Sequence, residues 1–335
     1  MTTVSLSRAA EPFEAVETAI DLLGGIKKLL RLGSRILIKP NLVFALHSST
    51  GFTTDPRIVE ALIELCEDSE PSRIVIAEGS GGTNTPLAFE RCGYLPLKER
   101  YGIELVDLNR APTVNVDVPG GKYLKRISLP RIVHESDLII NVPKLKLYRS
   151  GRWASISIKN LLGLVPDRGQ YSDQPFEDEF YLELSPEFWV PGGKLFLPHH
   201  RRWWRPSGEK RKIHGNLSEG LVDLERMVRP ALNVVDAFEV NTDIDMRAAK
   251  GEPGFTLGAV IAGCDPLAVD CIATRIAGVD PMRVPYLKRA AVRGIGESRL
   301  DRIQVVGTLL DELLHIWESA QRLRPSNELS GQSEL

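Results

Sequence analysis

Short apolar runs alternate with amphipathic stretches over most of the chain. Runs such as 35–39 and 138–142 have the length and composition of buried strands, whereas 56–67 repeats apolar residues at helical spacing. Further strands are predicted at 72–77, 103–107, 232–236, 256–262 and 303–307, and further helices at 20–32, 85–93, 216–227, 265–278 and 309–323. Strands separated by helices pair in parallel through crossovers. The pattern therefore predicts an α/β fold with a mostly parallel sheet flanked by helices.

Two of the predicted helices begin with clear capping signals. Thr54-Asp55 precedes Pro56, which combines a side-chain acceptor with a proline at the first helical position. Asn216 is followed three residues later by Glu219, the spacing of a capping box. These residues fix the expected starts of the two helices.

The segment 168–215 breaks the alternation. It contains three of the five tryptophans, many prolines, glycines and acids, and then the basic, aromatic run Arg201-Arg-Trp-Trp-Arg205. We therefore predict one domain, made of an N-terminal α/β half (1–167), an insertion or lid (168–215), a C-terminal α/β half (216–324) and a disordered tail (325–335). We interpret the basic, aromatic run as a solvated edge of the lid, and the alternative is contact with a membrane surface, single-stranded nucleic acid or a polyanion. His214 is expected at the surface.

Charge and composition exclude several classes of protein. The 335-residue chain has a net charge of −2, which argues against a general nucleic-acid binder. It has no apolar run of the length that spans a bilayer, and the acidic start at Glu11 does not resemble a signal peptide, so we expect a cytoplasmic protein. Its four cysteines include no C-x-x-C pair, so an iron–sulfur cluster held by this chain alone is not expected.

A basic run follows the predicted strand 138–142. It places five cations within sixteen residues, namely Lys144, Lys146, Arg149, Arg152 and Lys159. Ligands of α/β proteins bind beyond the carboxyl ends of the strands, so this run predicts an anion site. A lysine there binds a carboxylate or phosphate as a point charge, or serves as an acid or base when burial lowers its pKa. We assign catalysis to Lys144 and Lys159 and substrate binding to Lys146 and Asn160; the alternative is a solvated basic loop.

Two other strand ends carry candidate ligand groups. Lys39 and Asn41 end the strand 35–39, although a strand-ending proline with a turn asparagine explains the same pattern. Glu78-Gly79-Ser80-Gly81 lies between a strand and a helix, where backbone N–H groups can approach an anion. This loop lacks the dinucleotide fingerprint, and an ordinary glycine-rich turn is the alternative. We assign all six of these residues to substrate binding.

Two aspartates complete the set of candidate residues. Asp236 ends a buried strand among other acids, a composition that suits a hard divalent cation or a base, or else a polar loop with capping aspartates. Asp265 is explained as the N-cap of the helix that opens with Pro266. Asp270 falls near the apolar face of that helix and needs a partner, for which a lysine of the basic run is the candidate. We therefore predict Asp270 as catalytic, and Asp236 with Asp270 as ligands of a divalent metal; the cofactor is otherwise unknown.

The order of these motifs resembles the domain-of-unknown-function 362 family from about residue 34 to residue 307. The matching pieces are Lys39-Pro40-Asn41, Thr54-Asp55-Pro56, Glu78-Gly79-Ser80-Gly81, Pro143-Lys144-Leu145-Lys146, Lys159-Asn160-Leu161-Leu162-Gly163, Val235-Asp236-Ala237 and Gly263-Cys264-Asp265-Pro266 through Asp270. The resemblance implies an α/β fold and an occasional link to ferredoxin-type iron–sulfur modules. This chain lacks such a module, and it has Tyr148 where many relatives carry a histidine.

Three functions are consistent with these features. The favoured one is an enzyme that acts on a small anionic, carboxylated or phosphorylated substrate, with a metal as a possible aid. The second, which rests on the resemblance, is a redox subunit that works with a separate ferredoxin-like protein. The third is a non-catalytic protein that binds a membrane or polyanion through its lid. The sequence does not identify the substrate or the reaction.

Overall fold

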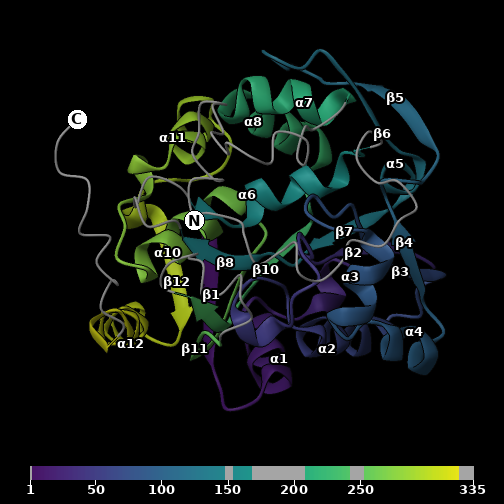
Figure 1. The fold of residues 1–335 in the computed structure, drawn as a ribbon. Coiled ribbons are helices and arrows are strands. Elements are labelled where there is room, and N and C mark those ends of the chain that lie inside the picture. Colours follow the sequence, from purple (N-terminus) through teal and green to yellow (C-terminus); the bar gives the residue numbers. More distant parts are fainter. Residues whose placement is uncertain (1, 148–153, 168–207, 242–252, 324–335) are drawn as a thin grey trace, which may run out of the picture.

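The computed structural model describes residues 2–147, 154–167, 208–241 and 253–323. Its centre is a ten-stranded sheet (Figure 1). Eight of the strands follow the order β12-β1-β11-β10-β7-β2-β3-β4; of the other two, β8 pairs with β10 and β9 pairs with β8. The strands of the sheet are β1 (Thr2–Arg8), β2 (Arg35–Lys39), β3 (Arg73–Glu78), β4 (Glu104–Asp107), β7 (Leu138–Asn141), β8 (Lys144–Leu147), β9 (Ala154–Ser155), β10 (Leu232–Asn241), β11 (Phe255–Gly263) and β12 (Ile303–Gly307). A separate hairpin pairs β5 (Thr113–Asp117) with β6 (Arg126–Pro130).

The predicted α/β class is confirmed, and the parallel part of the sheet is continuous. Strands β10, β7, β2, β3 and β4 run parallel to one another in this order. Strand β11 runs antiparallel to both β10 and β1, and β12 is parallel to β1. Because strands from both halves of the chain enter one sheet, the two halves share their core.

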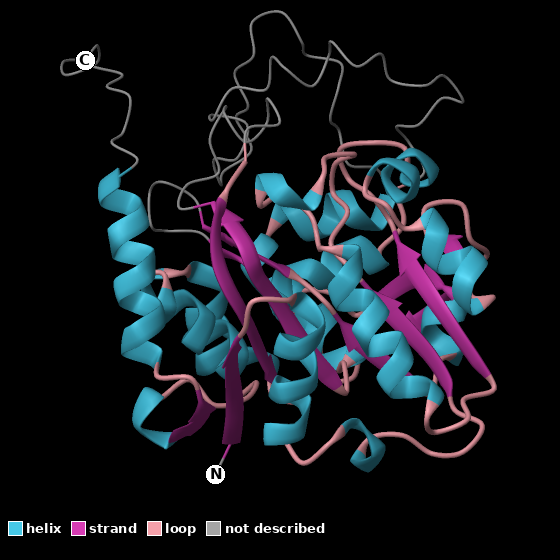
Figure 2. Cartoon of the chain, turned by 90° about the horizontal axis from the view of Figure 1, so that it is seen from below, coloured by secondary structure: helices cyan, strands magenta, loops and turns pink. Residues whose placement is uncertain are grey.

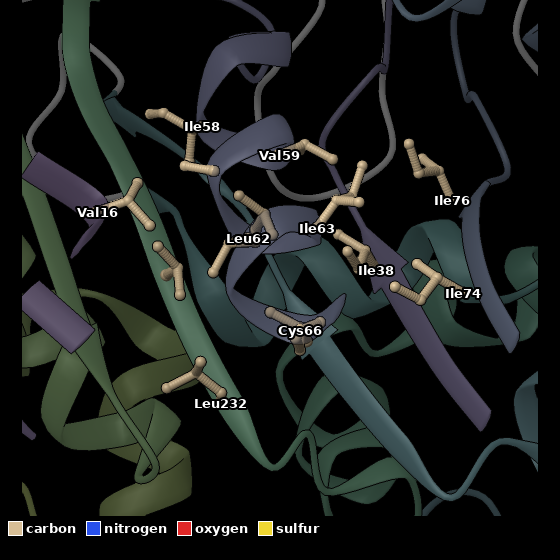
Figure 3. Close-up of a cluster of buried hydrophobic side chains, with 14 of the residues drawn as sticks. Val16, Ile38, Ile58, Val59, Leu62, Ile63, Cys66, Ile74, Ile76 and Leu232 are labelled. Carbon is tan, nitrogen blue, oxygen red and sulfur yellow. The ribbon is translucent and has the colours of Figure 1, made fainter. Parts of the chain in front are cut away.

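Helices cover both faces of the sheet (Figure 2). One face carries α1 (Pro12–Leu22), α2 (Pro56–Glu67), α3 (Thr85–Arg91) and α4 (Leu95–Tyr101), whose buried apolar residues belong to one cluster with Ile36 and Ile38. Figure 3 shows part of this cluster, with Val16 of α1, Leu62 of α2 and Ile38 of β2. The other face carries α5 (Arg131–Glu135), α6 (Ser157–Asn160), α7 (Gly208–Gly215), α8 (Leu217–Val228), α10 (Pro266–Ile276), α11 (Pro285–Val292) and α12 (Leu310–Leu323). Leu37 faces this second layer, as the alternation of side chains along a strand requires.

Most predicted elements lie where the pattern placed them, and helix α2 matches its predicted bounds. The Asp55 side chain accepts the N–H of Arg57, which confirms the predicted N-cap. The predicted helix 20–32 is wrong. The helix runs from Pro12 to Leu22, because Gly24 and Gly25 adopt φ values of 93° and 86° that end it.

Several parts of the fold were not predicted, among them strand β1 and the β5–β6 hairpin. Strand β1 pairs with β11 on one side and with β12 on the other, although its residues are polar at alternate positions. Ile127 and Leu129 of β6 join an apolar cluster of the second layer. Strand β10 extends five residues beyond the predicted end at Asp236, because β8 continues the sheet beside it. The additional length carries the sheet past the carboxyl ends of its neighbours.

The predicted insertion is described only in part. Residues 168–207 and the predicted tail from residue 325 lie outside the described residues. The last eight residues of the predicted insertion form α7, which packs against α8 and buries Ile213 completely. Among the described residues, no helix is both long and apolar enough to cross a membrane.

Candidate functional site

A row of polar side chains crosses the carboxyl edge of the parallel sheet. Asp107 of β4 lies opposite Glu78 of β3, and Lys39 of β2 lies opposite Asn141 of β7. Asn141 lies in turn opposite Asn233 of β10. Apart from Asp107 these residues are buried. The edge of the sheet therefore carries a continuous polar seam, in the place where α/β proteins bind ligands.

Lys39 and Glu78 form a buried ion pair at the centre of this seam. The Lys39 Nζ lies 3.0 Å from both carboxylate oxygens of Glu78, and the two side chains are 0% and 3% exposed. The same carboxylate accepts the backbone N–H groups of Leu42 and Gly79. Burial lowers the pKa of Lys39, and the charge of Glu78 opposes that shift. The positive charge of Lys39 is thus neutralised within the protein.

The glycine at position 163 gives this ion pair its space. A Cβ atom there would collide with Glu78 Oε1 and would lie 2.6 Å from Lys39 Nζ. The carbonyl oxygen of Gly163 also lies 2.6 Å from the position of a Cβ at Gly79. The two glycines therefore allow the segment after α6 and the loop after β3 to close around the pair.

The N–H groups of the glycine-rich loop donate within the protein. The N–H of Gly79 donates to Glu78, that of Ser80 to Thr85 Oγ1, and that of Gly82 to the carbonyl of Val43. The Ser80 hydroxyl donates to the carbonyl of Leu42. These bonds hold the loop beside the ion pair, and substrate binding by Glu78, Gly79, Ser80 and Gly81 stays a prediction.

A second buried ion pair joins β8 to β10. The Lys144 Nζ lies 2.9 Å from Asp236 Oδ2, and both side chains are fully buried. Asp236 also accepts the N–H groups of Asp55 and Phe238, at 2.8 and 3.0 Å. Burial raises the pKa of Asp236. Both carboxylate oxygens of Asp236 thus accept N–H donors. Through the N–H of Asp55, which caps α2, Asp236 connects β10 to the start of that helix.

Four asparagines form a hydrogen-bonded chain beside the first ion pair. Asn41 donates to Asn160 Oδ1 at 2.8 Å, and Asn160 donates to Asn141 Oδ1 at 2.8 Å. Asn141 donates to Asn233 Oδ1 at 2.9 Å, and Lys39 Nζ lies 3.4 Å from Asn160 Oδ1. This chain links the loop after β2 to α6, β7 and β10 and fixes the orientation of the Asn41 and Asn160 amides.

Lys146 differs from the other two buried lysines of β2 and β8. Its Nζ donates to Asn41 Oδ1 at 2.6 Å and to the carbonyl oxygen of Phe52 at 3.0 Å, and both acceptors are neutral. The residue is 4% exposed, and its Nζ lies 6.0 Å from the centre of the Phe52 ring. Burial lowers the pKa of Lys146 far below its usual value, and the charges of Lys159, Lys144 and Lys39 lower it further.

Lys159 and Asn160 lie on the short helix α6, which Asp270 holds in place. The Asp270 carboxylate accepts the N–H groups of Ser157 and Ile158, at 2.7 and 3.0 Å. Burial raises the pKa of Asp270 to about 7. Its partners are therefore backbone amides, and the predicted lysine partner is corrected. Lys159 is half-buried, and its charge acts on Lys146.

Helix α7 adds two residues that the sequence analysis did not assign to the site. Lys210 is 2% exposed, and its Nζ lies 3.4 Å from the carbonyl oxygen of Gly79. Burial lowers the pKa of Lys210, whereas Asp167 and Glu78 oppose that shift. His214, expected at the surface, is half-buried; burial lowers its pKa to about 4, and Lys159 and Lys210 contribute to the lowering. Both lie at the end of the compositionally irregular segment 168–215, where no periodic pattern predicted a buried face.

The structure brings most of the predicted residues to one edge of the sheet but does not support the predicted metal pair. Asp236 and Asp270 are engaged by different N–H donors, one beside β8 and the other beneath α6. Within the described residues, no group of three or more histidine, cysteine, aspartate or glutamate side chains is placed to hold a metal ion. The cysteines are free thiols; Cys264 is exposed, and Cys66, Cys92 and Cys271 are buried.

Comparison with known proteins assigns the chain to a family. The sequence model of the family described as "Domain of unknown function (DUF362)" matches residues 36–275, most of the chain, so the chain belongs to this family. A thylakoid-associated protein of Synechocystis sp. is 26% identical over 320 residues, which cover 93% of this chain and 84% of that protein.

Two solved structures resemble the chain weakly. The lactate racemase apoprotein from Thermoanaerobacterium thermosaccharolyticum aligns with a TM-score of 0.42 and 12% identity, over 79% of this chain and 55% of that one. A protein from Thermotoga maritima aligns with a TM-score of 0.41 and 10% identity, over 79% of this chain and 59% of that one. The chain thus spans little more than half the length of these two proteins.

Proposed function

We propose that this member of the DUF362 family is an enzyme that acts on a small anionic substrate, carboxylated or phosphorylated, at the lysine-rich edge of the sheet. The proposal rests mainly on Lys146, a buried lysine whose Nζ donates only to neutral oxygens among the described residues. A buried charge without an opposite charge is costly, because it loses its hydration. An anion bound beside Lys146 would offset that cost.

The surrounding charges support the same conclusion. Lys39 and Lys144 are each matched by a carboxylate within hydrogen-bonding distance. Lys159 lies on α6 close enough to Lys146 for its charge to lower the pKa of that side chain. Two lysines with like charge that share one region bind an anion more strongly than either alone, particularly where burial reduces the screening by water.

The proposed roles follow from these partners. Lys146 and Lys159 hold the anion, and the amides of Asn41 and Asn160 orient it, since the asparagine chain fixes both of them. Lys39 and Lys144 maintain the shape of the site through their ion pairs. A fixed set of cationic and amide donors stabilises negative charge that develops during a reaction, which is the main electrostatic contribution to catalysis.

Thermal unfolding with added anions tests the binding step. Inorganic phosphate, malonate and citrate are added at constant ionic strength to wild-type protein, Lys146→Met and Lys98→Met. Lys98 lies exposed on α4 and serves as the matched control. A ligand present at a hundred times its Kd stabilises the folded state by about 2.7 kcal/mol. We expect at least one anion to raise the Tm of the wild type and of Lys98→Met but not of Lys146→Met; equal shifts in all three proteins would contradict the assignment.

Turnover is tested separately from binding. Hydroxy acids, oxo acids and phosphate monoesters are incubated with the wild type and with Lys159→Met and are followed by proton NMR. We expect chemical change of at least one compound with the wild type and much slower change with the variant. If an anion binds at the site but no compound of these classes is converted, the protein binds anions without catalysing a reaction of them, and the proposed enzymatic activity is contradicted.

A further inference from the structure

The hydrogen bonds of Lys146 match those of a neutral amine. A protonated lysine has three N–H donors, whereas the neutral amine has two and a lone pair. Among the described residues the Lys146 Nζ has two acceptors, Asn41 Oδ1 at 2.6 Å and the carbonyl oxygen of Phe52 at 3.0 Å. Asn41 is itself held by the hydrogen bond from its Nδ2 to Asn160. Two fixed acceptors thus account for both N–H groups of an amine and leave its lone pair outside these bonds.

The charged groups around Lys146 favour the same protonation state. Lys159 on α6, Lys144 on β8 and Lys39 on β2 all repel a proton on Nζ. Glu78 on β3 attracts one, but its carboxylate is already hydrogen-bonded by Lys39 and by the N–H groups of Leu42 and Gly79. On the side of β9 the register partner of Lys146 is Ser155, and on β10 it is Asn241, and neither carries charge. Burial and three cations therefore outweigh one engaged carboxylate.

We infer that anion binding at this site is coupled to proton uptake by Lys146: the residue is a neutral amine while no anion is bound, and it becomes an ammonium group when an anion lies between it and Lys159. This inference rests on the proposed function and names the regulation of its site, because the affinity for an anion of unchanged charge then rises as pH falls. The proton comes from the solvent and forms a bond with the lone pair of Nζ. No bond of the anion is broken, so no oxidant or reductant is needed.

The protonation state is measured directly on the full chain. Lysine labelled with carbon-13 at Cε is incorporated, and the Cε resonances are followed from pH 5 to pH 10. The resonance that is missing in Lys146→Arg belongs to Lys146, and Lys146→Gln provides the same identification if the arginine variant does not fold. We expect the shift of a neutral amine at pH 7.5 and the ammonium shift only at lower pH. An ammonium shift at pH 7.5 in the absence of anions would overturn the inference.

A second arm separates this inference from the proposed function. Saturating phosphate or malonate is added to the labelled wild type at pH 7.5, and binding is measured in parallel by calorimetry in two buffers of different ionisation enthalpy. We expect the Lys146 resonance to move to its ammonium position and about one proton to be taken up per bound anion. Binding without proton uptake overturns the inference and leaves the proposed function standing. Failure of both anions to bind overturns both, even if Lys146 is neutral.

Discussion

The three buried lysines of β2 and β8 differ in what surrounds their charge. Lys39 and Lys144 each lie within 3.0 Å of a buried carboxylate, whereas Lys146, two residues after Lys144 on the same strand, donates to an amide and a backbone carbonyl. All three are less than 5% exposed. Burial alone therefore does not distinguish these lysines; the presence or absence of an opposite charge does. In the proposed function, Lys39 and Lys144 maintain the shape of the site and Lys146 binds the anion.

The largest predicted loss of stability comes from removing one charge of the buried ion pair between Lys144 and Asp236. Asp236→Asn leaves the fully buried Lys144 without its opposite charge. Removing one partner of a buried ion pair costs about 3–5 kcal/mol, because the remaining charge has neither water nor a counterion. We expect a loss of that size in urea unfolding. Glu239→Gln on the same strand is the control, since its carboxylate accepts from Thr256 at the surface; a similar loss there would contradict the explanation.

The next effect concerns Asp270, which anchors the helix that carries Lys159. Its pKa is about 7 in the folded protein and ~3.9 in an unfolded chain. Between these values the folded state binds a proton that the unfolded state does not, so stability falls as pH rises from about 4 to about 7. We expect a contribution to the slope of up to ~1.4 kcal/mol per pH unit. Unfolding at several pH values measures it; an unchanged slope in Asp270→Asn would rule out this residue as the cause.

A smaller loss is expected from a methyl group beside the first ion pair. In Gly163→Ala the new Cβ collides with Glu78 and crowds Lys39. Overpacking of this kind costs about 1–3 kcal/mol. Gly81→Ala is the matched control, because the nearest atom to a Cβ there is Val43 Cγ2 at 3.8 Å. Chemical denaturation of the two variants compares them, and equal losses would show that Gly163 does not make room for the ion pair.

The smallest effect is expected at Lys146 itself. Lys146→Met keeps the length of the side chain and removes a buried group that has no counter-charge among the described residues. We expect the free energy of unfolding to change by less than ~1 kcal/mol, or to increase. Urea unfolding of this variant beside Asp236→Asn provides the contrast. A loss as large as that of Asp236→Asn would place Lys146 with the structural lysines.

The sequence predicted the part of the site that lies at strand ends. Lys39, Glu78 and Lys146 were identified because the carboxyl ends of parallel strands meet at one edge of a sheet. Asn141 and Asn233 were not, although a polar residue inside an apolar strand is a signal that was available. In a buried strand such a side chain needs partners, and these two are partners of each other.

Other parts of the site depend on contacts that no local pattern reveals. Asp270 was expected to meet a lysine, but it accepts backbone N–H groups, which every segment carries and no side-chain pattern distinguishes. Lys210 and His214 lie at the end of an irregular segment, and they become buried and half-buried where α7 packs against α8. Lys144 and Lys146 lie in the same motif and on the same face of one strand. Their spacing therefore could not predict that Lys144 pairs with a carboxylate and Lys146 does not.

The most direct test of the central claim is a calorimetric titration of the wild type, Lys146→Met and Lys98→Met with the anion that stabilises the wild type most. We predict that the wild type and Lys98→Met bind it with the same affinity and that Lys146→Met binds it at least ten times more weakly, while its free energy of unfolding is preserved. Equal affinity of Lys146→Met and the wild type would contradict the claim that the buried lysine without a counter-charge forms the anion site.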